Sequence, residues 1–196
     1  ANSTPCDQVA MTFSATQQAG SGTVSQWYWD FNNSITSIEG NGQNPSFTFA
    51  GPGSYTTHLV SETNHLCRDT MTQIVYVNYV PTPFFTVNDS MSCPRHCVTF
   101  TDLTPTIPGP ASLATWTWEL GDGSNPTVNN TNASVDNCYI NNSSNQLAQY
   151  TVKLTVTTDA GCTNSLTKTN YITVYPKPIA NYSVNPNPSN VLEPLV

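Results

Sequence analysis

Apolar and polar residues alternate with a period of two along several stretches of this chain. From Tyr150 to Thr157, every second residue is apolar and the residues between are Thr or Lys. Successive side chains of an extended strand point to opposite faces, so this pattern predicts a half-buried strand. Trp27, Trp29 and Phe31 share one face in the same way. Because no window shows the apolar spacing of three and four that indicates a helix, the pattern predicts an all-β protein.

The same order of motifs occurs twice along the chain. Each copy has a cysteine seven residues before a strand phenylalanine, a Trp-x-Trp strand, a Tyr-Thr-x-x-Leu strand, a cysteine twelve residues after that tyrosine, a β-branched strand and a Pro-x-Pro joint. The matching segments are 6–13 and 93–100, 27–31 and 116–120, 55–59 and 150–154, 67 and 162, 74–77 and 171–174, and 81–83 and 176–178. This repetition predicts two modules of like fold, residues 1–79 and 80–177, each a sandwich of short strands.

These motifs resemble those of the PKD (polycystic kidney disease) domain, and the second copy also has the turn Gly121-Asp122-Gly123 of that family. The first copy departs from the family there, with Asn32-Asn33-Ser34. The resemblance implies an all-β fold with two tandem immunoglobulin-like (PKD-type) β-sandwiches. The hairpin end at Gly161-Cys162 and the Pro joints are similar to PKD arrays of gliding and adhesive Bacteroidetes, which are typically exported by the type IX system.

The two copies differ at their beginnings. The second copy opens with an extra strand, residues 83–87, where the first has only residues 1–5. A similar segment, 178–184, follows the second copy and predicts an extra C-terminal strand. Two explanations stay open: residues 178–196 are the start of a further module, or they complete the first module of the next chain, with Ile179, Tyr182 and Val184 as the donor strand. An open sheet edge is a template for such pairing.

Composition narrows the range of partners. Charged residues make up 9% of the chain, only five residues are basic, and the net charge is −7. So few cations cannot neutralise a run of phosphates, which excludes nucleic acid and an anionic membrane surface as partners. No apolar run reaches the length of a membrane span, so no membrane insertion is expected.

Six cysteines without a CxxC pair indicate structural disulfides and an oxidising compartment, and therefore a secreted or cell-surface protein. Spacing alone leaves all fifteen pairings open. Aligning the copies on the PKD resemblance implies the pairs Cys6–Cys67 and Cys93–Cys162, with Cys97–Cys138 as a third bridge.

Candidate chemical sites are few. Cys93, His96 and Cys97 resemble part of a zinc site, but disulfides explain these cysteines without a fourth ligand. Asp122 could contribute to a calcium site, although Asp between two glycines is also typical of a tight turn. No cofactor is therefore expected. The histidines stand in no nucleophile motif and the acids are scattered, so no enzyme is predicted.

Two surface features complete the candidate sites. Exposed aromatic side chains can bind sugars by stacking on their rings. Trp27 and Trp29, however, share a face with Phe31 and are expected in the core. Tyr28 lies on the opposite face of the same strand and is the residue to examine for a ligand. Asp69-Thr70-Met71 and Asp89-Ser90-Met91 are similar to the Asp-Ser/Thr-apolar motif of O-linked glycosylation in Bacteroidetes, so Thr70 and Ser90 are candidate sugar sites.

The sequence therefore predicts a non-enzymatic spacer of an extracellular stalk, filament or adhesin. Its expected partners are neighbouring modules or copies of itself arranged head to tail, and a polysaccharide or host surface. The alternative is a carbohydrate- or protein-binding module of a secreted protein, which predicts aromatic side chains grouped on one surface.

Overall fold

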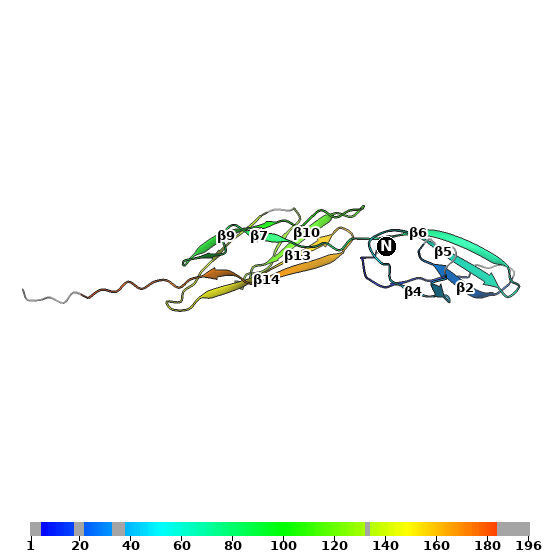
Figure 1. Ribbon diagram of the computed structural model, residues 1–196, viewed down its shortest axis with the longest axis horizontal. Helices are drawn as coiled ribbons and strands as arrows, with labels where there is room; N and C mark the ends of the chain where they lie inside the picture. Colours follow the sequence, from blue (N-terminus) through cyan, green and yellow to red (C-terminus); the bar gives the residue numbers. More distant parts are fainter. Residues whose placement is uncertain (1–4, 18–21, 33–37, 132–133, 184–196) are drawn as a thin grey trace, which may run out of the picture.

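The protein is an all-β chain of two tandem β-sandwiches, as the sequence predicts. A computed structural model describes residues 5–17, 22–32, 38–131 and 134–183. The two modules lie end to end, with strands β1–β6 in the first module and β7–β14 in the second (Figure 1). In the described part of the chain, no helix is long and apolar enough to cross a membrane.

The first module has a four-stranded antiparallel sheet, in the order β3-β2-β5-β6, facing the short pair β1-β4. Its strands are β1 (Met11–Thr12), β2 (Val24–Asp30), β3 (Gly40–Asn41), β4 (Ser46–Phe47), β5 (Gly53–Thr63) and β6 (Arg68–Val77). The core between them is aromatic, with Phe31 fully buried and in ring contact with Phe13, Trp29, Phe47 and Phe49.

The second module has a five-stranded sheet, in the order β11-β10-β13-β14-β8, facing the three-stranded sheet β12-β9-β7. Its strands are β7 (Phe85–Val87), β8 (Met91–Ser92), β9 (His96–Asp102), β10 (Leu113–Glu119), β11 (Thr127–Asn129), β12 (Val135–Tyr139), β13 (Ala148–Thr158) and β14 (Thr163–Val174). The alternation in β13 buries Val152, Leu154 and Val156 completely, as expected for the inner face of a sandwich.

The joint between the modules lies between Val77, the last residue of β6, and Phe85, the first residue of β7. Pro81 in this joint is buried, and its carbonyl accepts a hydrogen bond of 2.9 Å from Nδ2 of Asn164 at the start of β14. The joint is therefore attached to the second module and is not a free linker.

The segment after β14 differs from the sequence expectation. Its described part, residues 178–183, forms no strand, and Ile179 and Tyr182 are 76% and 87% exposed. Val184 lies outside the described residues. A strand needs a neighbour for its backbone hydrogen bonds, and within the described residues this segment pairs with none.

Candidate strand-binding groove

Strand β7 closes one side of the second module. It pairs antiparallel with β9, with Val87 opposite Phe100 and Phe85 opposite Asp102. The Phe85 side chain is fully buried, with its ring centroid 5.2 Å from that of Trp118 and 6.5 Å from that of Phe100. Nζ of Lys168 on β14 donates a hydrogen bond of 2.7 Å to the Phe85 carbonyl. Strand β7 is thus the edge strand of the β12-β9-β7 sheet, and the Lys168 hydrogen bond connects it to β14 of the facing sheet.

The first module has a groove at the equivalent position. Within the described residues, β1 pairs only with β4, so no strand takes the place that β7 has beside β9. The groove has a volume of about 680 Å³ and is open to solvent. Side chains from both sheets line it, among them Met11, Phe13, Trp29, Leu59, Met71 and Val75.

The free edge of β1 has backbone groups available for a partner. The Phe13 and Ala15 amides donate to the carbonyls of Pro45 and Gln43 on the β4 side. Because residues of a strand alternate in the direction of their backbone groups, those of Thr12, Ser14 and Thr16 point to the other side. In the second module, the equivalents of these three residues are Thr99, Thr101 and Leu103, counted from the matched cysteines.

Those equivalents pair with the β7 segment. The Leu103 amide donates to the Phe84 carbonyl and the Asn88 amide donates to the Thr99 carbonyl. The edge of β1 therefore has the same polarity of free groups as the edge that β9 uses to bind β7.

Side-chain burial shows what the groove leaves uncovered. Phe100 is fully buried in the second module, whereas its equivalent Phe13 is only partly buried. Leu166 on β14 is partly buried, whereas its equivalent Met71 on β6 is 65% exposed. The first module therefore exposes more apolar surface on this side than the second module, in which Phe85 of β7 packs against Phe100.

The six cysteines connect differently from the pairing that the sequence implied. Cys97 and Cys138 form the expected disulfide between the paired strands β9 and β12. Cys6 bonds Cys162 across the joint between the modules, and Cys67 and Cys93 are free and exposed. The implied pairs Cys6–Cys67 and Cys93–Cys162 are wrong.

Strand length explains why those pairs cannot form. The backbone of Cys6 forms an isolated β-bridge with Asn78, just after the end of β6, whereas Cys67 stands just before the start of β6. Ten residues of strand place these cysteines roughly 33 Å apart, far beyond the 7 Å that a disulfide tolerates between Cα atoms. Cys93 and Cys162 stand at opposite ends of β14 in the same way.

The zinc alternative does not fit this arrangement. Cys97 is committed to its disulfide. His96 is buried, with Nε2 3.1 Å from the Asp89 carbonyl. The described residues contain no group of three or more His, Cys, Asp or Glu side chains placed to hold a metal ion.

Asp122 lies in a tight turn. Its carboxylate accepts hydrogen bonds from the Ser124 amide at 3.0 Å and from Nδ2 of Asn137 at 2.8 Å. Partial burial alone would raise the pKa of Asp122, but the hydrogen bonds from Ser124 and Asn137 outweigh it and hold the pKa below its ordinary value. Gly121 and Gly123 flank it with φ of 78° and 84°, and a Cβ on Gly121 would lie 2.3 Å from the Thr151 carbonyl oxygen. The turn explains these residues without an ion.

The tryptophans face the cores. Trp29 is buried and its indole N–H donates to the Gly42 carbonyl at 2.9 Å, and Trp27 packs partly buried against the same core. Trp116 is buried and donates to the Asp102 carboxylate at 2.8 Å. The expectation that the Trp27–Phe31 face lies in the core is confirmed. Tyr28 faces outward, with the Arg68 guanidinium 6.0 Å from its ring centroid.

The two candidate sugar sites differ in accessibility. Thr70 on β6 is exposed, whereas Ser90 is partly buried and its carbonyl accepts a hydrogen bond from the Thr173 amide. Their glycosylation stays a prediction.

Comparison with known proteins finds a family match over the second module. Residues 80–174 match the PKD domain family. This match covers β7–β14 and slightly less than half of the chain. No curated protein matches the chain.

Solved structures resemble the chain at 11% identity. One is a structure of the Clostridium thermocellum CbhA fibronectin(III)-like modules, with a TM-score of 0.45 over 92% of this chain and 93% of the other. Another is the amphioxus IgVJ-C2 molecule, with a TM-score of 0.32 over 85% of this chain and 98% of the other.

A PKD module is typically an extracellular structural or binding domain, and modules of this kind are generally non-catalytic. The two disulfides also indicate an extracellular domain.

Proposed function

We propose that this chain is a non-enzymatic structural segment of an extracellular stalk, filament or adhesin, and that its copies assemble head to tail by strand donation. The observation that carries the proposal is the open groove beside β1 in the first module. In the second module, β7 fills the equivalent position beside β9. The donor is residues 178–184 of a neighbouring chain, which enter the groove as residues 81–87 enter the second module.

Spacing along the chain supports this donor. Counted from the last residue of the closing strand and not from the Pro-x-Pro joints, Tyr182 and Val184 stand eight and ten residues after Val174, as Phe85 and Val87 stand after Val77. Tyr182 is therefore the equivalent of Phe85, and Val184 that of Val87. In the same register, Val184 pairs opposite Phe13 and the Tyr182 ring enters between the two sheets, covering Phe13. Fully burying one such side chain contributes about 1.5–3 kcal/mol.

Polar groups of the groove fit a donated backbone. Gln73 stands six residues after Cys67, as Lys168 stands six residues after Cys162. Gln73 lines the groove and is exposed. Its amide can donate to the Tyr182 carbonyl as the Lys168 ammonium donates to the Phe85 carbonyl. The donated strand can therefore form backbone hydrogen bonds with the free edge of β1 on one side and with the Gln73 side chain on the other.

The donor side is tested with Tyr182→Asp in the full chain. A carboxylate at this position cannot enter an apolar groove without a large desolvation cost, so we expect monomers by light scattering at concentrations where the wild-type chain forms head-to-tail oligomers. Asn181→Asp is the matched control, because it adds the same charge one residue away, at the equivalent of the 52% exposed Phe84. Equal oligomer mass for the wild type and Tyr182→Asp would contradict strand donation.

The acceptor side is tested with a peptide of residues 176–188. The Tyr182→Asp chain keeps its groove but has no competent donor, so the peptide should bind it saturably in calorimetry. A peptide carrying the same Tyr182→Asp change should not bind. Gln73→Ala in the chain should weaken binding about fivefold, the loss of one hydrogen bond.

A further inference from the structure

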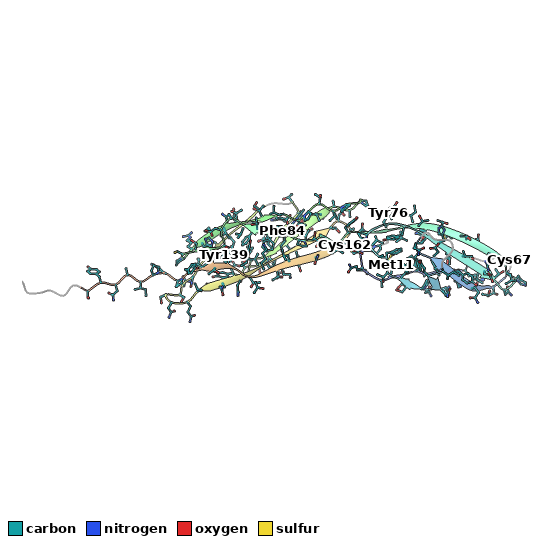
Figure 2. The ribbon with its side chains drawn as sticks, viewed as in Figure 1. Met11, Cys67, Tyr76, Phe84, Tyr139 and Cys162 are labelled. Carbon is teal, nitrogen blue, oxygen red and sulfur yellow. A yellow bond between two sulfur atoms is a disulfide. The ribbon has the colours of Figure 1, made fainter. Side chains whose placement is uncertain are left out.

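The disulfide Cys6–Cys162 joins equivalent features of neighbouring modules in a defined order. Cys162 ends the turn between β13 and β14, and this turn faces the joint (Figure 2). Cys6 stands beside the end of β6, on the joint side of the first module. The bond therefore runs from the cysteine at the start of one module to the hairpin turn of the module that follows.

Cys67 stands in the hairpin turn of the first module that is equivalent to the turn of Cys162 in the second module. The Thr158 amide donates to the Cys162 carbonyl at 2.9 Å, and the Cys162 amide donates to Oγ1 of Thr158 at 3.0 Å. Thr63 and Cys67 exchange the same two bonds at 2.9 Å and 3.2 Å. The first module therefore presents the Cys67 thiol as the second module presents Cys162, but at the end of the molecule away from the joint (Figure 2).

Cys93 has the position in the second module that Cys6 has in the first module. The Asn78 amide, just after β6, donates to the carbonyl of Pro5, the residue before Cys6, at 2.8 Å. The Tyr175 amide, just after β14, donates to the carbonyl of Ser92, the residue before Cys93, at 2.9 Å. Cys93 is therefore held beside the last residues of β14, next to the point where residues 175–183 leave the second module.

We propose that Cys93 of one chain and Cys67 of the next form an interchain disulfide that repeats the Cys6–Cys162 bond. The inference deepens the proposed function and rests on it, because donation of residues 178–184 seats the first module of the next chain behind the second module of the donor. In that arrangement, Cys93 and Cys67 have the relation that Cys6 and Cys162 have within the chain.

The two thiols cannot pair within one chain. Cys67 and Cys93 are separated by β6 and β14, two strands that follow each other along the molecule (Figure 1). At about 3.3 Å per residue these strands place the thiols roughly 70 Å apart. Both thiols are exposed and accessible to an oxidant and to a second chain.

Bond formation needs a disulfide oxidant, RSSR, such as oxidised glutathione. The Cys93 thiolate attacks one sulfur of RSSR and releases RS⁻. The Cys67 thiolate of the next chain then attacks the Cys93 sulfur of the mixed disulfide and releases the second RS⁻. The two cysteines lose two electrons and two protons in total, and RSSR is reduced to two RSH.

The experiment compares single-cysteine variants of the full chain in a glutathione redox buffer, read on non-reducing gels. Cys67→Ser and Cys93→Ser each keep one of the two thiols, so their mixture should form a covalent dimer and stop there, whereas the wild type forms a ladder and the double variant forms neither. Seating by the donated strand raises the effective thiol concentration, so the mixture should form dimer on the order of tenfold faster than either variant alone. Peptide mapping should place the new bond between Cys67 and Cys93.

Three results separate the two proposals. Dimer formed as fast by either variant alone as by the mixture would mean unspecific oxidation and overturn the interchain bond. Non-covalent oligomers without cross-linking in the mixture would overturn the bond and leave strand donation standing. Specific cross-linking that persists in a Tyr182→Asp background would support the bond and contradict its dependence on strand donation.

Discussion

The two modules share their strand order and core positions but differ on one side. In the second module, β7 covers Phe100 and brings Phe85 into the core. In the first module, the corresponding side is the groove beside β1, where Phe13 and Met71 reach solvent. One short strand thus separates a closed sandwich from an open one. The open module has apolar surface and backbone groups that fit a strand from elsewhere.

The largest expected effect compares Phe100 with Phe13. Phe100→Ala should lower the stability of the second module by about 3–5 kcal/mol, because it leaves a cavity beside Phe85 and Trp118. Phe13→Ala should lower that of the first module by roughly half as much, because its ring is only partly buried. Hydrogen-exchange protection of β10 measures the stability of the second module, and that of β2 measures the stability of the first. Both variants also carry Tyr182→Asp, so that no donated strand fills the groove. Equal losses would contradict the open groove.

The second comparison concerns disulfides within a module. The Cys97–Cys138 bond closes a loop with a sequence separation of 41, whereas the first module contains no disulfide of its own. Replacing both cysteines with Ser should destabilise the second module by about 2–4 kcal/mol in the chain-entropy description. Denaturant unfolding followed by hydrogen exchange in β9 and β12 measures this loss. Cys67→Ser is the control and should leave stability unchanged, since Cys67 forms no disulfide in the isolated chain and its hydrogen bonds to Thr63 use backbone groups that Ser keeps.

The third comparison concerns the two hairpin turns. Leu66 has φ of 64° where the second module has Gly161 with φ of 86°. A left-handed conformation costs a non-glycine residue about 1 kcal/mol, and Leu66 is 77% exposed, so little packing offsets it. Leu66→Gly should therefore stabilise the first module by up to about 1 kcal/mol, and Gly161→Leu should destabilise the second by at least as much. Thermal unfolding of both variants tests the pair, and opposite signs are required.

The smallest effect is the pH dependence that Asp122 gives to the stability of the second module. The pKa of Asp122 is lower in the folded protein than in the unfolded chain, so its contribution to stability is present above the unfolded pKa and is lost as the pH falls through the folded pKa. Asp122→Asn should flatten the loss of stability below about pH 4 by less than about 1 kcal/mol. A steeper acid loss in Asp122→Asn would have the wrong sign.

Local pattern predicted several of the strands, although the segment expected to form a strand after β14 forms none over its described residues 178–183. The alternation at Tyr150–Thr157 gave β13, the Trp-x-Trp motifs gave β2 and β10, and the extra strand expected at 83–87 is present as Phe85–Val87. These inferences succeed because strand periodicity and the repeated motifs can be recognised within short stretches of the sequence.

Cysteine connectivity depends on contacts that no local pattern contains. Aligning the copies treated each module as a closed unit, but Cys6 and Cys67 stand at opposite ends of β6. Only the end-to-end stacking of the modules brings Cys162 to Cys6, with a Cα–Cα distance of 5.6 Å. The ten residues of strand between Cys67 and Asn78 were a signal in the sequence that could have excluded the intramodule pair.

The Cys6–Cys162 bond, with a sequence separation of 156, also decides how the protein responds to tension. Force applied between Cys6 and the residues after β14 passes from sulfur to sulfur and bypasses nearly all of both sandwiches. Only the chain beyond Cys162 is left to lengthen, and most of that is β14, paired along its length with β13. A pull that would unravel an unbridged pair of modules therefore meets a covalent path first.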